Sequence, residues 1–330
     1  WNFPLAMIAR KVAPALAVGC TAVIKPDERT PLSAIEFMRL AEEADLPPGT
    51  VNLVTGEPAP IVEAWLGDPR VRAISFTGST EVGRLLMRGA SRHLARVSLE
   101  LGGHAPFLVF ADADLDRAVE AAAASKFRNA GQTCICANRF IVEASIADRF
   151  AEAFAARAGQ LRCGRGRDAG TTTGPLIDDA AMEKVEEHVR DAVAHGARAI
   201  CGGERTRIDG LADRFFAPTV LDRLDPSMRI WREETFGPVA AIARFETEAE
   251  AIAMANDTEY GLAAYFFTRD ASRLMRVAEA LEYGIVGAND ALPSTAEAPF
   301  GGVKQSGFGR EGGRWGLEEF TSLKYVSWKV

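Results

Sequence analysis

A cysteine and a glutamate, each in a glycine-containing segment, are the residues of this chain best suited to covalent chemistry. Residues 131–136 read Gly-Gln-Thr-Cys-Ile-Cys, and the segment Glu100-Leu-Gly-Gly lies upstream of them. A thiolate can attack a carbonyl carbon, and a carboxylate can take a proton from the water that later releases the acyl group. The pair therefore predicts a two-step acyl transfer, with Cys134 as the nucleophile and Glu100 as the general base.

A second cysteine, Cys136, follows two residues after the first and allows three interpretations. A Cys-x-Cys pair can be half of a metal site, but no further His or Cys has the spacing that a four-ligand site needs. Reversible disulfide formation could silence the nucleophile, and a packed bystander thiol is the remaining alternative. We therefore predict no metal site and treat Cys136 as a redox candidate.

The bulk composition is typical of a soluble globular protein. The chain has 330 residues, of which 48% are hydrophobic and 25% charged, and this length allows two domains with separate cores. A net charge of −7 and scattered Lys and Arg residues argue against a nucleic-acid or membrane-surface partner. Five irregularly spaced cysteines form no disulfide framework, which suggests a reducing, cytoplasmic location.

Helix-like and strand-like patterns alternate along the chain. Short β-prone runs such as Ala73–Phe76 are followed by helical segments such as Glu81–Ala90, and the same alternation continues beyond residue 103. In the first hundred residues this order predicts an open, mostly parallel sheet covered on both faces, and beyond residue 103 it again predicts the α/β class. The last residues, Ser322–Val330, alternate apolar and polar side chains like a strand without a nearby partner, so we expect them to pair with another subunit.

Seven short motifs follow one another in a fixed order. Besides the segments around Cys134 and Glu100, they read Trp1-Asn2-Phe3-Pro4, Lys25-Pro26-Asp27-Glu28, Phe76-Thr77-Gly78-Ser79, Glu234-Thr235-Phe236-Gly237-Pro238 and Pro299-Phe300-Gly301-Gly302. In this order and at these spacings the set resembles the aldehyde dehydrogenase superfamily over nearly the whole chain. The resemblance implies that residues 1–102 are the C-terminal part of a dinucleotide-binding domain. It implies a catalytic domain over 103–310, and a C-terminal return with an oligomerisation strand over 311–330. A homodimer or homotetramer is then expected.

The same resemblance implies a role for each catalytic residue. Asn2 would donate its side-chain amide to the oxyanion that develops when Cys134 attacks an aldehyde, and Glu100 would activate the water that hydrolyses the thioester. Relatives that transfer the acyl group to coenzyme A commonly lack an acid at the position of Glu100. The presence of Glu100 therefore implies that the product is a free acid.

The resemblance also implies a nicotinamide dinucleotide as the hydride acceptor. The ordinary Gly-x-Gly-x-x-Gly fingerprint is absent, but Gly78 and Ser79 end a strand and open a helix, where N–H groups can bind a pyrophosphate. The Glu28 carboxylate would accept hydrogen bonds from ribose hydroxyls and repel a 2′-phosphate, so NAD is preferred. NADP remains possible because Arg29 is adjacent. The expected cofactor contacts are Trp1, Lys25, Glu28, Gly78, Ser79, Leu101, Glu234 and Phe236.

Longer motifs resemble the succinate-semialdehyde dehydrogenase branch of this superfamily, notably Ser125–Asn138 and Asn256–Tyr265. In that branch two arginines and a serine hold the distal carboxylate of the substrate, and the matching positions are Arg10, Arg128 and Ser294. A forked guanidinium binds a carboxylate bidentately, so such a clamp would exclude uncharged aldehydes. Glutarate semialdehyde stays open, because the loop that precedes Ser294 departs from the pattern.

Three other functions remain as alternatives: a dehydrogenase of uncharged or cationic aldehydes, a non-catalytic binding or structural protein of the same fold, and an esterase-like thiol hydrolysis that needs no nicotinamide. The chain lacks an initiator Met and opens inside a motif, so we expect a fragment with an incomplete cofactor domain. An unpaired sheet edge would make such a fragment poorly stable when alone.

Overall fold

The computed structural model describes all of residues 1–330, and the chain divides into two compact units. Unit 1 comprises Trp1–Leu101, Ser294–Gly301 and Gly307–Val330, and unit 2 comprises Gly102–Pro293 and Gly302–Ser306. The division after residue 101 lies one position from the domain boundary expected from the sequence. Segments 294–301 and 307–330 belong to the first unit. The assignment of the chain to a cofactor domain, a catalytic domain and a C-terminal return stays a prediction.

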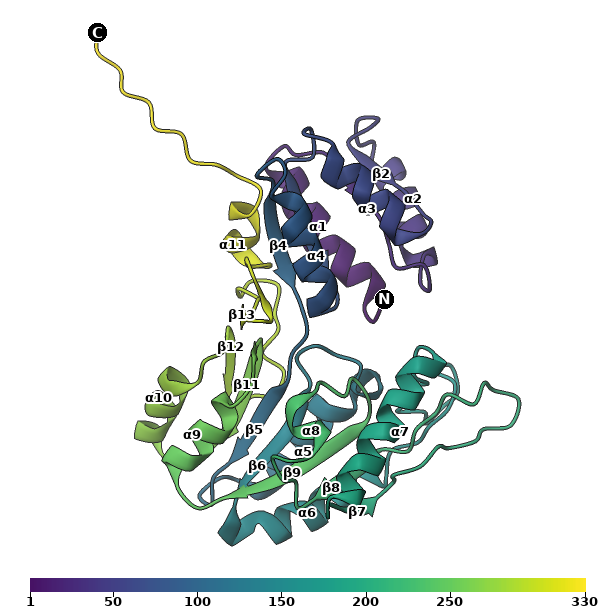
Figure 1. The fold of residues 1–330 in the computed structure, drawn as a ribbon, viewed down its shortest axis with the longest axis vertical. Coiled ribbons are helices and arrows are strands. Elements are labelled where there is room, and N and C mark those ends of the chain that lie inside the picture. The colour runs from purple at the N-terminus through teal and green to yellow at the C-terminus, as the bar shows by residue number, and fades with distance from the viewer. The chain divides into compact units, whose positions relative to one another are not determined.

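Unit 2 is built on a seven-stranded sheet in the order β12-β11-β5-β6-β9-β8-β7 (Figure 1). All neighbouring strands are parallel except β7 and β8, and the sheet with its helices confirms the α/β class predicted for this part of the chain. The strands are β5 (Ala105–Val109), β6 (Ala137–Glu143), β7 (Arg198–Cys201), β8 (Thr219–Asp222), β9 (Val239–Phe245), β11 (Ala263–Phe267) and β12 (Ile285–Ala288). Two shorter strands, β10 (Tyr260–Gly261) and β13 (Val303–Lys304), pair separately.

Helices cover both faces of this sheet. Successive side chains of each strand point to opposite faces, and apolar side chains on both faces need to be buried. On one face Leu108, Ile141 and Phe266 pack against α9 (Glu248–Asn256) and α10 (Ala271–Ala280). On the other face Phe107 and Phe140 form an aromatic cluster with side chains of α5 and α6. The remaining helices are α5 (Leu115–Phe127), η1 (Arg128–Gly131), α6 (Ala144–Ala158), α7 (Asp179–Ala194) and α8 (Arg229–Arg232).

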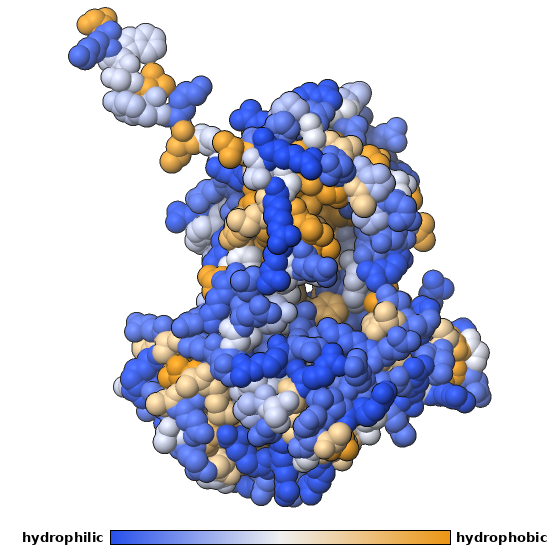
Figure 2. Space-filling view, viewed as in Figure 1, coloured by the Kyte–Doolittle hydropathy of each residue, from blue (hydrophilic) through white to orange (hydrophobic).

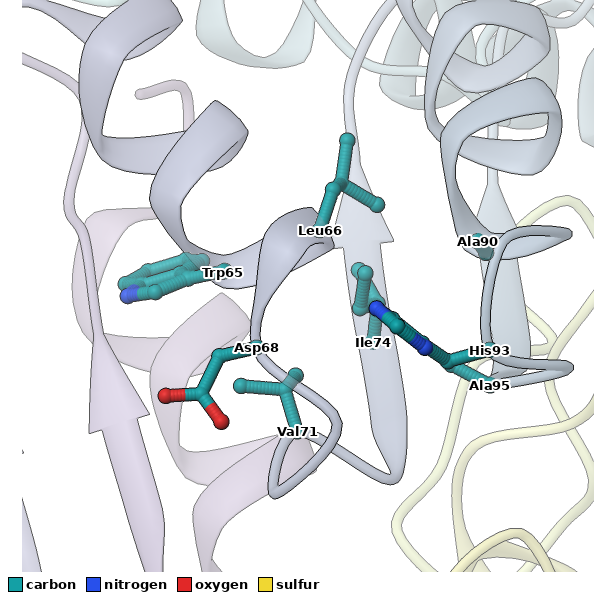
Figure 3. Close-up of a pocket in the computed structure, with 8 residues that line it drawn as sticks. All are labelled: Trp65, Leu66, Asp68, Val71, Ile74, Ala90, His93 and Ala95. Atoms are coloured by element: carbon teal, nitrogen blue, oxygen red, sulfur yellow. The ribbon is translucent and has the colours of Figure 1, made fainter.

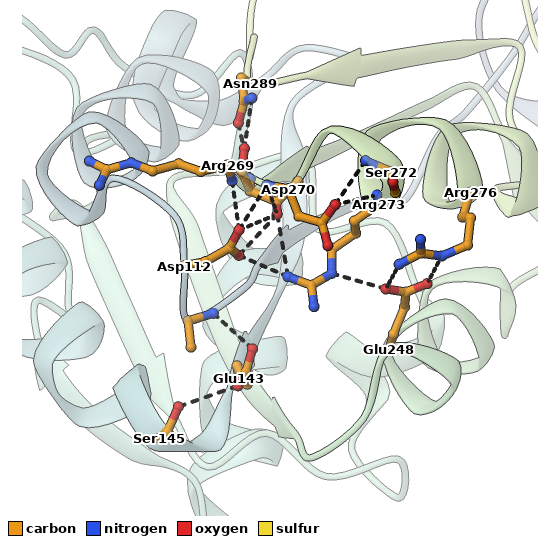
Figure 4. Close-up of polar contacts among 12 residues, drawn as sticks. Asp112, Glu143, Ser145, Glu248, Arg269, Asp270, Ser272, Arg273, Arg276 and Asn289 are labelled. Atoms are coloured by element: carbon orange, nitrogen blue, oxygen red, sulfur yellow. Dashed lines mark hydrogen bonds and ion pairs between the residues drawn. The ribbon is translucent and has the colours of Figure 1, made fainter.

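The carboxyl ends of the central strands are closed by a network of paired charges (Figure 4). Asp112, just beyond β5, accepts hydrogen bonds from the backbone N–H groups of Arg269 and Asp270 at 2.8 and 2.9 Å. Arg273 on α10 pairs with Asp112 at 2.8 Å and with Glu248 at 2.9 Å. Open α/β sheets usually bind ligands at this edge, but here paired charges fill it.

Unit 1 has two small sheets instead of the single sheet that the sequence predicted. Strand β1 (Ala22–Ile24) pairs in parallel with β2 (Val51–Leu53), and β3 (Ala73–Thr77) pairs in parallel with β4 (Arg96–Glu100). A short strand, β14 (Gly307–Phe308), adds to β4 in the antiparallel direction. No strand of the chain pairs with both sheets, so they stay separate. The helices are α1 (Pro4–Ala17), α2 (Leu32–Glu43), α3 (Pro58–Gly67), α4 (Thr80–Ala90) and α11 (Gly313–Glu318).

Each small sheet has a modest apolar core of its own. Ile8, Val12 and Val51 lie in the first core, and Leu86 and Leu99 in the second. The crevice between α3, β3 and α4, drawn in Figure 3, is the end of this second core. It leaves no free volume for a water-sized molecule (about 0 Å³), so it is packing and not a ligand site.

Most of the exposed large apolar side chains belong to unit 1, and Figure 2 shows them gathered on it. Leu32 and Leu94 are 77% and 91% exposed. The segment Ser322–Val330, expected to be a strand, has no regular secondary structure and is exposed. A strand needs a hydrogen-bonded partner, and this chain provides none for it. No helix is both long enough and apolar enough to cross a membrane.

Candidate active site

The Cys134 turn connects η1 to β6 and has an unusual backbone. Asn129, Ala130 and Gly131 all adopt left-handed conformations, with φ of 52°, 56° and 72°. A side-chain carbon at Gly131 would lie 2.1 Å from the carbonyl oxygen of Gly237, so only glycine fits there. Left-handed non-glycine residues cost about 1–3 kcal/mol each and persist only where the surroundings enforce them. Such strain is typical of functional turns.

The turn is enforced by hydrogen bonds to its neighbours. The Gln132 side chain donates to the carbonyl oxygens of Asn129 and Pro175 at 3.1 and 3.2 Å, and accepts from the N–H of Ile177 at 2.9 Å. The buried Tyr265 hydroxyl donates to the carbonyl oxygen of Ile135 at 2.5 Å. Cys134 itself is half-buried and in no disulfide. The nucleophile candidate is thus presented on a pre-organised turn.

Two further segments of unit 2 pack directly against this turn. A side-chain carbon at Gly103 would lie 2.4 Å from the carbonyl oxygen of Cys134. The N–H of Gly103 donates to Oε1 of Glu234 at 3.0 Å. Desolvation raises the pKa of Glu234 to about 7, against the effect of this hydrogen bond. Phe236, the other expected cofactor residue here, also has a left-handed backbone with φ of 55°. These segments precede β5, β6 and β9, so the site lies at the amino ends of three adjacent parallel strands.

The Cys136 side chain is buried beside the Cys134 turn. Its side chain is 2% exposed, and its thiol donates to the carbonyl oxygen of Gly131 at 3.2 Å. Burial raises the pKa of the Cys136 thiol, although the buried Lys126 ammonium, 3.6 Å away, opposes the shift. A thiol with a raised pKa is a poor nucleophile. The redox role of Cys136 stays a prediction.

Glu100 ends β4 in unit 1 and is 4% exposed. Neither of its carboxyl oxygens has a hydrogen-bond partner in the protein. Burial and the neighbouring Glu311 carboxylate raise the pKa of Glu100 well above its usual value, and Lys11, Arg310 and Arg10 oppose the shift. A buried carboxyl group with open acceptor sites is suited to take a proton from water.

The residues around Glu100 were not identified from the sequence. Lys11 on α1 pairs with the buried Glu311 and donates to the Thr77 hydroxyl at 2.6 Å. One signal was available, because Arg10 and Lys11 interrupt an otherwise apolar helix, and buried charges in such a helix need partners. Glu311 carries no comparable signal in the sequence.

Two of the three clamp residues are in contact in unit 1. Arg10 Nη2 donates to the Ser294 hydroxyl at 3.1 Å, and its guanidinium lies 4.1 Å from the centre of the Phe300 ring. Arg10 Nη1 also lies 3.8 Å from Glu311. Arg128 belongs to unit 2, where it begins η1 on an exposed position next to the Cys134 turn. The arginine of unit 1 is therefore held in a fixed orientation.

The expected dinucleotide contacts in unit 1 lie on or beside α1, β1, β4 and α4. Lys25 Nζ pairs with the exposed Glu28 carboxylate at 2.8 Å, and Arg29 is bound by Asp27 at 2.8 Å over the Trp1 ring. Arg29 is thus already paired, which weakens its case as a 2′-phosphate ligand. Asn2 is half-buried immediately before α1.

Three of the expected cofactor contacts are engaged within unit 1. The N–H of Gly78 donates to the carbonyl oxygen of Glu100 at 3.0 Å, because β3 and β4 pair up to this point, so it is not free to bind pyrophosphate. Ser79 is the N-cap of α4, and its hydroxyl accepts from the N–H of Val82 at 3.3 Å. The Leu101 side chain is buried under Gly83 of α4, which leaves only its backbone for a cofactor.

The aldehyde dehydrogenase family model matches residues 1–326. The chain belongs to the aldehyde dehydrogenase family. Membership in this family confirms the predicted fold class. It also confirms the predicted reaction class, because the family oxidises aldehydes with NAD(P). The individual site residues remain predictions.

Curated members of the aldehyde dehydrogenase family match 99% of this chain. They are succinate-semialdehyde dehydrogenase [NADP(+)] of Escherichia coli (54% identical), 3-sulfolactaldehyde dehydrogenase of Pseudomonas putida (55%) and glutarate-semialdehyde dehydrogenase of Pseudomonas putida (53%). The chain spans 67%, 66% and 67% of their respective lengths, about two thirds in each case. A solved succinate-semialdehyde dehydrogenase from Burkholderia pseudomallei is 54% identical with a TM-score of 0.97, over 99% of this chain and 67% of that one.

Proposed function

We propose that this chain carries the catalytic residues of a dehydrogenase for aldehydes with a distal anionic group, with succinate semialdehyde as the preferred substrate. The observation that carries the proposal is Arg10, held by the Ser294 hydroxyl and the Phe300 ring. The named substrates of the three relatives are consistent with it, since two end in a carboxylate and one in a sulfonate. An oriented guanidinium binds either group through two hydrogen bonds. Arg128 is proposed as the second arginine.

The reaction begins with attack of the Cys134 thiolate on the aldehyde carbon. A C–S bond forms, and the carbonyl oxygen becomes an oxyanion that accepts a hydrogen bond from the Asn2 amide. A fixed donor at such an oxyanion contributes about 3–4 kcal/mol. Oxidation to the thioester requires loss of a hydride, and the nicotinamide ring supplies the acceptor when it is bound.

Hydrolysis of the thioester is the step assigned to Glu100. The carboxylate takes a proton from water, the hydroxide attacks the acyl carbon, and the C–S bond breaks to restore the Cys134 thiolate. The two carboxyl oxygens of Glu100, which have no hydrogen-bond partner in the protein, support this role. The net change is aldehyde plus water to carboxylate, with one hydride and protons released.

The residues of unit 1 fit the dinucleotide. The α4 N-terminus offers N–H groups for pyrophosphate, and exposed Glu28 offers carboxylate oxygens for ribose hydroxyls. Because Glu28 would repel a 2′-phosphate and Arg29 is bound by Asp27, we propose a preference for NAD. The Escherichia coli relative is named for NADP(+), so the preference needs a direct test.

Association of subunits completes the proposal. Leu323, Tyr325 and Trp328 are each more than 80% exposed in the unpaired C-terminal segment. Pairing of this segment with a second copy would bury them and satisfy their backbone groups. We therefore propose a homodimer or homotetramer, and light scattering of the protein with and without residues 322–330 tests it. A monomer that retains the segment would refute the idea.

The first experiment follows absorbance of the reduced nicotinamide. The protein is supplied with NAD or NADP and with succinate semialdehyde, glutarate semialdehyde, 3-sulfolactaldehyde or propanal, and Cys134→Ser is the negative control. Reduction with the anionic aldehydes and little with propanal supports the proposal, and their ranking identifies the substrate. Equal rates with propanal remove the clamp. No reduction, together with no labelling of Cys134 by a thiol reagent, favours a non-catalytic protein of the same fold.

A further inference from the structure

His188 is a fully buried histidine outside the residues assigned above. It lies on α7, whose buried face also carries Val185, one turn earlier. Its Nδ1 lies 3.1 Å from the Thr235 hydroxyl, and its Nε2 lies 3.1 Å from Oε2 of Glu233. The two contacts therefore flank Glu234, the expected ribose ligand.

The contacts specify one state of the imidazole. Glu233 is held ionised by Arg229, whose guanidinium makes two hydrogen bonds of 3.0 Å and lowers the pKa of that carboxyl group. A carboxylate only accepts, so Nε2 carries the hydrogen and Nδ1 must accept from the Thr235 hydroxyl. Burial lowers the pKa of His188, and the Glu233 carboxylate opposes the shift, so the ring is neutral near pH 7. Thr235 is 1% exposed, so its hydroxyl would lose a buried partner without the ring.

The preceding turn of α7, which carries Val185, supports the other end of the same loop. A side-chain carbon at Gly237 would lie 2.4 Å from Cγ2 of Val185. Between the two supports, Phe236 keeps its left-handed backbone, a conformation that neighbours must enforce. The Gly237 carbonyl oxygen in turn abuts Gly131 of the Cys134 turn. The loop 233–237 thus connects α7 to the nucleophile within unit 2.

We propose that His188 is a positioning residue that locks the loop 233–237, so that Glu234 and Phe236 are set for the nicotinamide dinucleotide before it binds. The inference rests on the proposed function for the roles of these two residues. Val185 contributes shape, whereas His188 contributes the two directed hydrogen bonds. Pre-setting the loop lowers the ordering cost of binding, so removal of His188 raises the dissociation constant of the cofactor.

The test compares His188→Leu and His188→Gln with His195→Leu. Leucine removes both hydrogen bonds, and glutamine keeps a donor near the Nε2 position. His195 is the C-cap of the same helix and is exposed, so it controls for the substitution itself. Hydrogen exchange of the peptide spanning 229–240 reports on the loop without any cofactor. Fluorescence titration with reduced dinucleotide gives the dissociation constant, and kinetics separates kcat from KM for cofactor and aldehyde.

Faster exchange of the 229–240 peptide, and a dissociation constant raised about tenfold in His188→Leu with partial recovery in His188→Gln, support the proposal. His195→Leu should match the unmodified protein in both readouts. Unchanged exchange, or faster exchange with an unchanged dissociation constant, overturns it and leaves His188 as a structural residue. If His188→Leu does not fold, the same criteria apply to His188→Gln. If the unmodified protein binds no dinucleotide, the proposed function fails, and the exchange result still decides whether His188 holds the loop.

Discussion

Replacement of Arg10 is the sharpest test of the substrate assignment. Arg10→Ala removes a guanidinium that the Ser294 hydroxyl and the Phe300 ring hold in one orientation. A hydrogen bond to a charged partner contributes about 1.5–3 kcal/mol, and each 1.4 kcal/mol is about tenfold. We therefore expect kcat/KM for succinate semialdehyde to fall by about 10- to 100-fold, mostly through KM, while kcat/KM for propanal changes less than about threefold.

The design must separate the clamp from the electrostatics of Glu100, because Arg10 Nη1 also lies 3.8 Å from Glu311. Arg10→Lys keeps the positive charge but loses the forked guanidinium. It should therefore lower kcat/KM for succinate semialdehyde less than Arg10→Ala does, and leave the pH profile unchanged. Arg72→Ala is the matched control, since Arg72 is exposed in the same unit. Equal losses on both aldehydes would refute the clamp and assign the effect of Arg10 to the fold or to Glu100.

Three further changes test the catalytic and cofactor groups. Glu100→Gln should abolish turnover but not labelling of Cys134. The pKa of Glu100 is higher in the folded protein than in the unfolded chain, so ionisation of Glu100 destabilises the fold as the pH rises. Glutamine does not ionise, so the Tm of Glu100→Gln minus the Tm of the unmodified protein should increase between pH 5 and pH 8. A constant difference in Tm would contradict the burial argument. Gly131→Ala should cost more than about 2 kcal/mol of unfolding free energy or prevent folding, because the methyl group meets the Gly237 carbonyl oxygen, and a denaturant titration measures it. Glu28→Ser should shift the ratio of kcat/KM for NAD over NADP about tenfold towards NADP; an unchanged ratio would remove Glu28 from cofactor selection.

The elements of the fold follow from local pattern. The expected segments Ala73–Phe76 and Glu81–Ala90 agree within one residue with β3 and α4, because Ser79 caps the helix and so marks where it begins. Strands β4 and β14 were not expected, since the pairing of β14 with β4 is decided by segments about 200 residues apart. The same reason explains why Ser322–Val330 has the pattern of a strand without being one in this chain.

The candidate site was predictable only in part. Its reactive residues stand in short sequence motifs, whereas the residues that contact them come from distant parts of the chain. Cys134, Glu100 and Glu234 stand in short motifs that can be found in a linear sequence. The groups that tune them, Lys11 and Glu311 for Glu100 and His188 for the loop around Glu234, lie far away in the chain and carry no motif. Their roles depend on which side chains share a buried volume, and residue pattern does not determine that.

The position of the nucleophile explains why strain collects where it does. Strands β5, β6 and β9 present their carboxyl ends to one edge of the sheet, where Asp112 and Arg273 form closed ion pairs, and their amino ends to the edge that bears Cys134. A turn that enters a buried parallel strand must satisfy its backbone locally, and here it does so with left-handed residues at 129–131 and at Phe236. The three non-glycine residues among them, Asn129, Ala130 and Phe236, cost about 1–3 kcal/mol each, a large share of the roughly 5–15 kcal/mol by which a domain is stable. The tightly packed sheet, with buried apolar side chains on both faces, can offset that cost. The rigid core is therefore the condition that allows a strained, pre-set site at its amino edge.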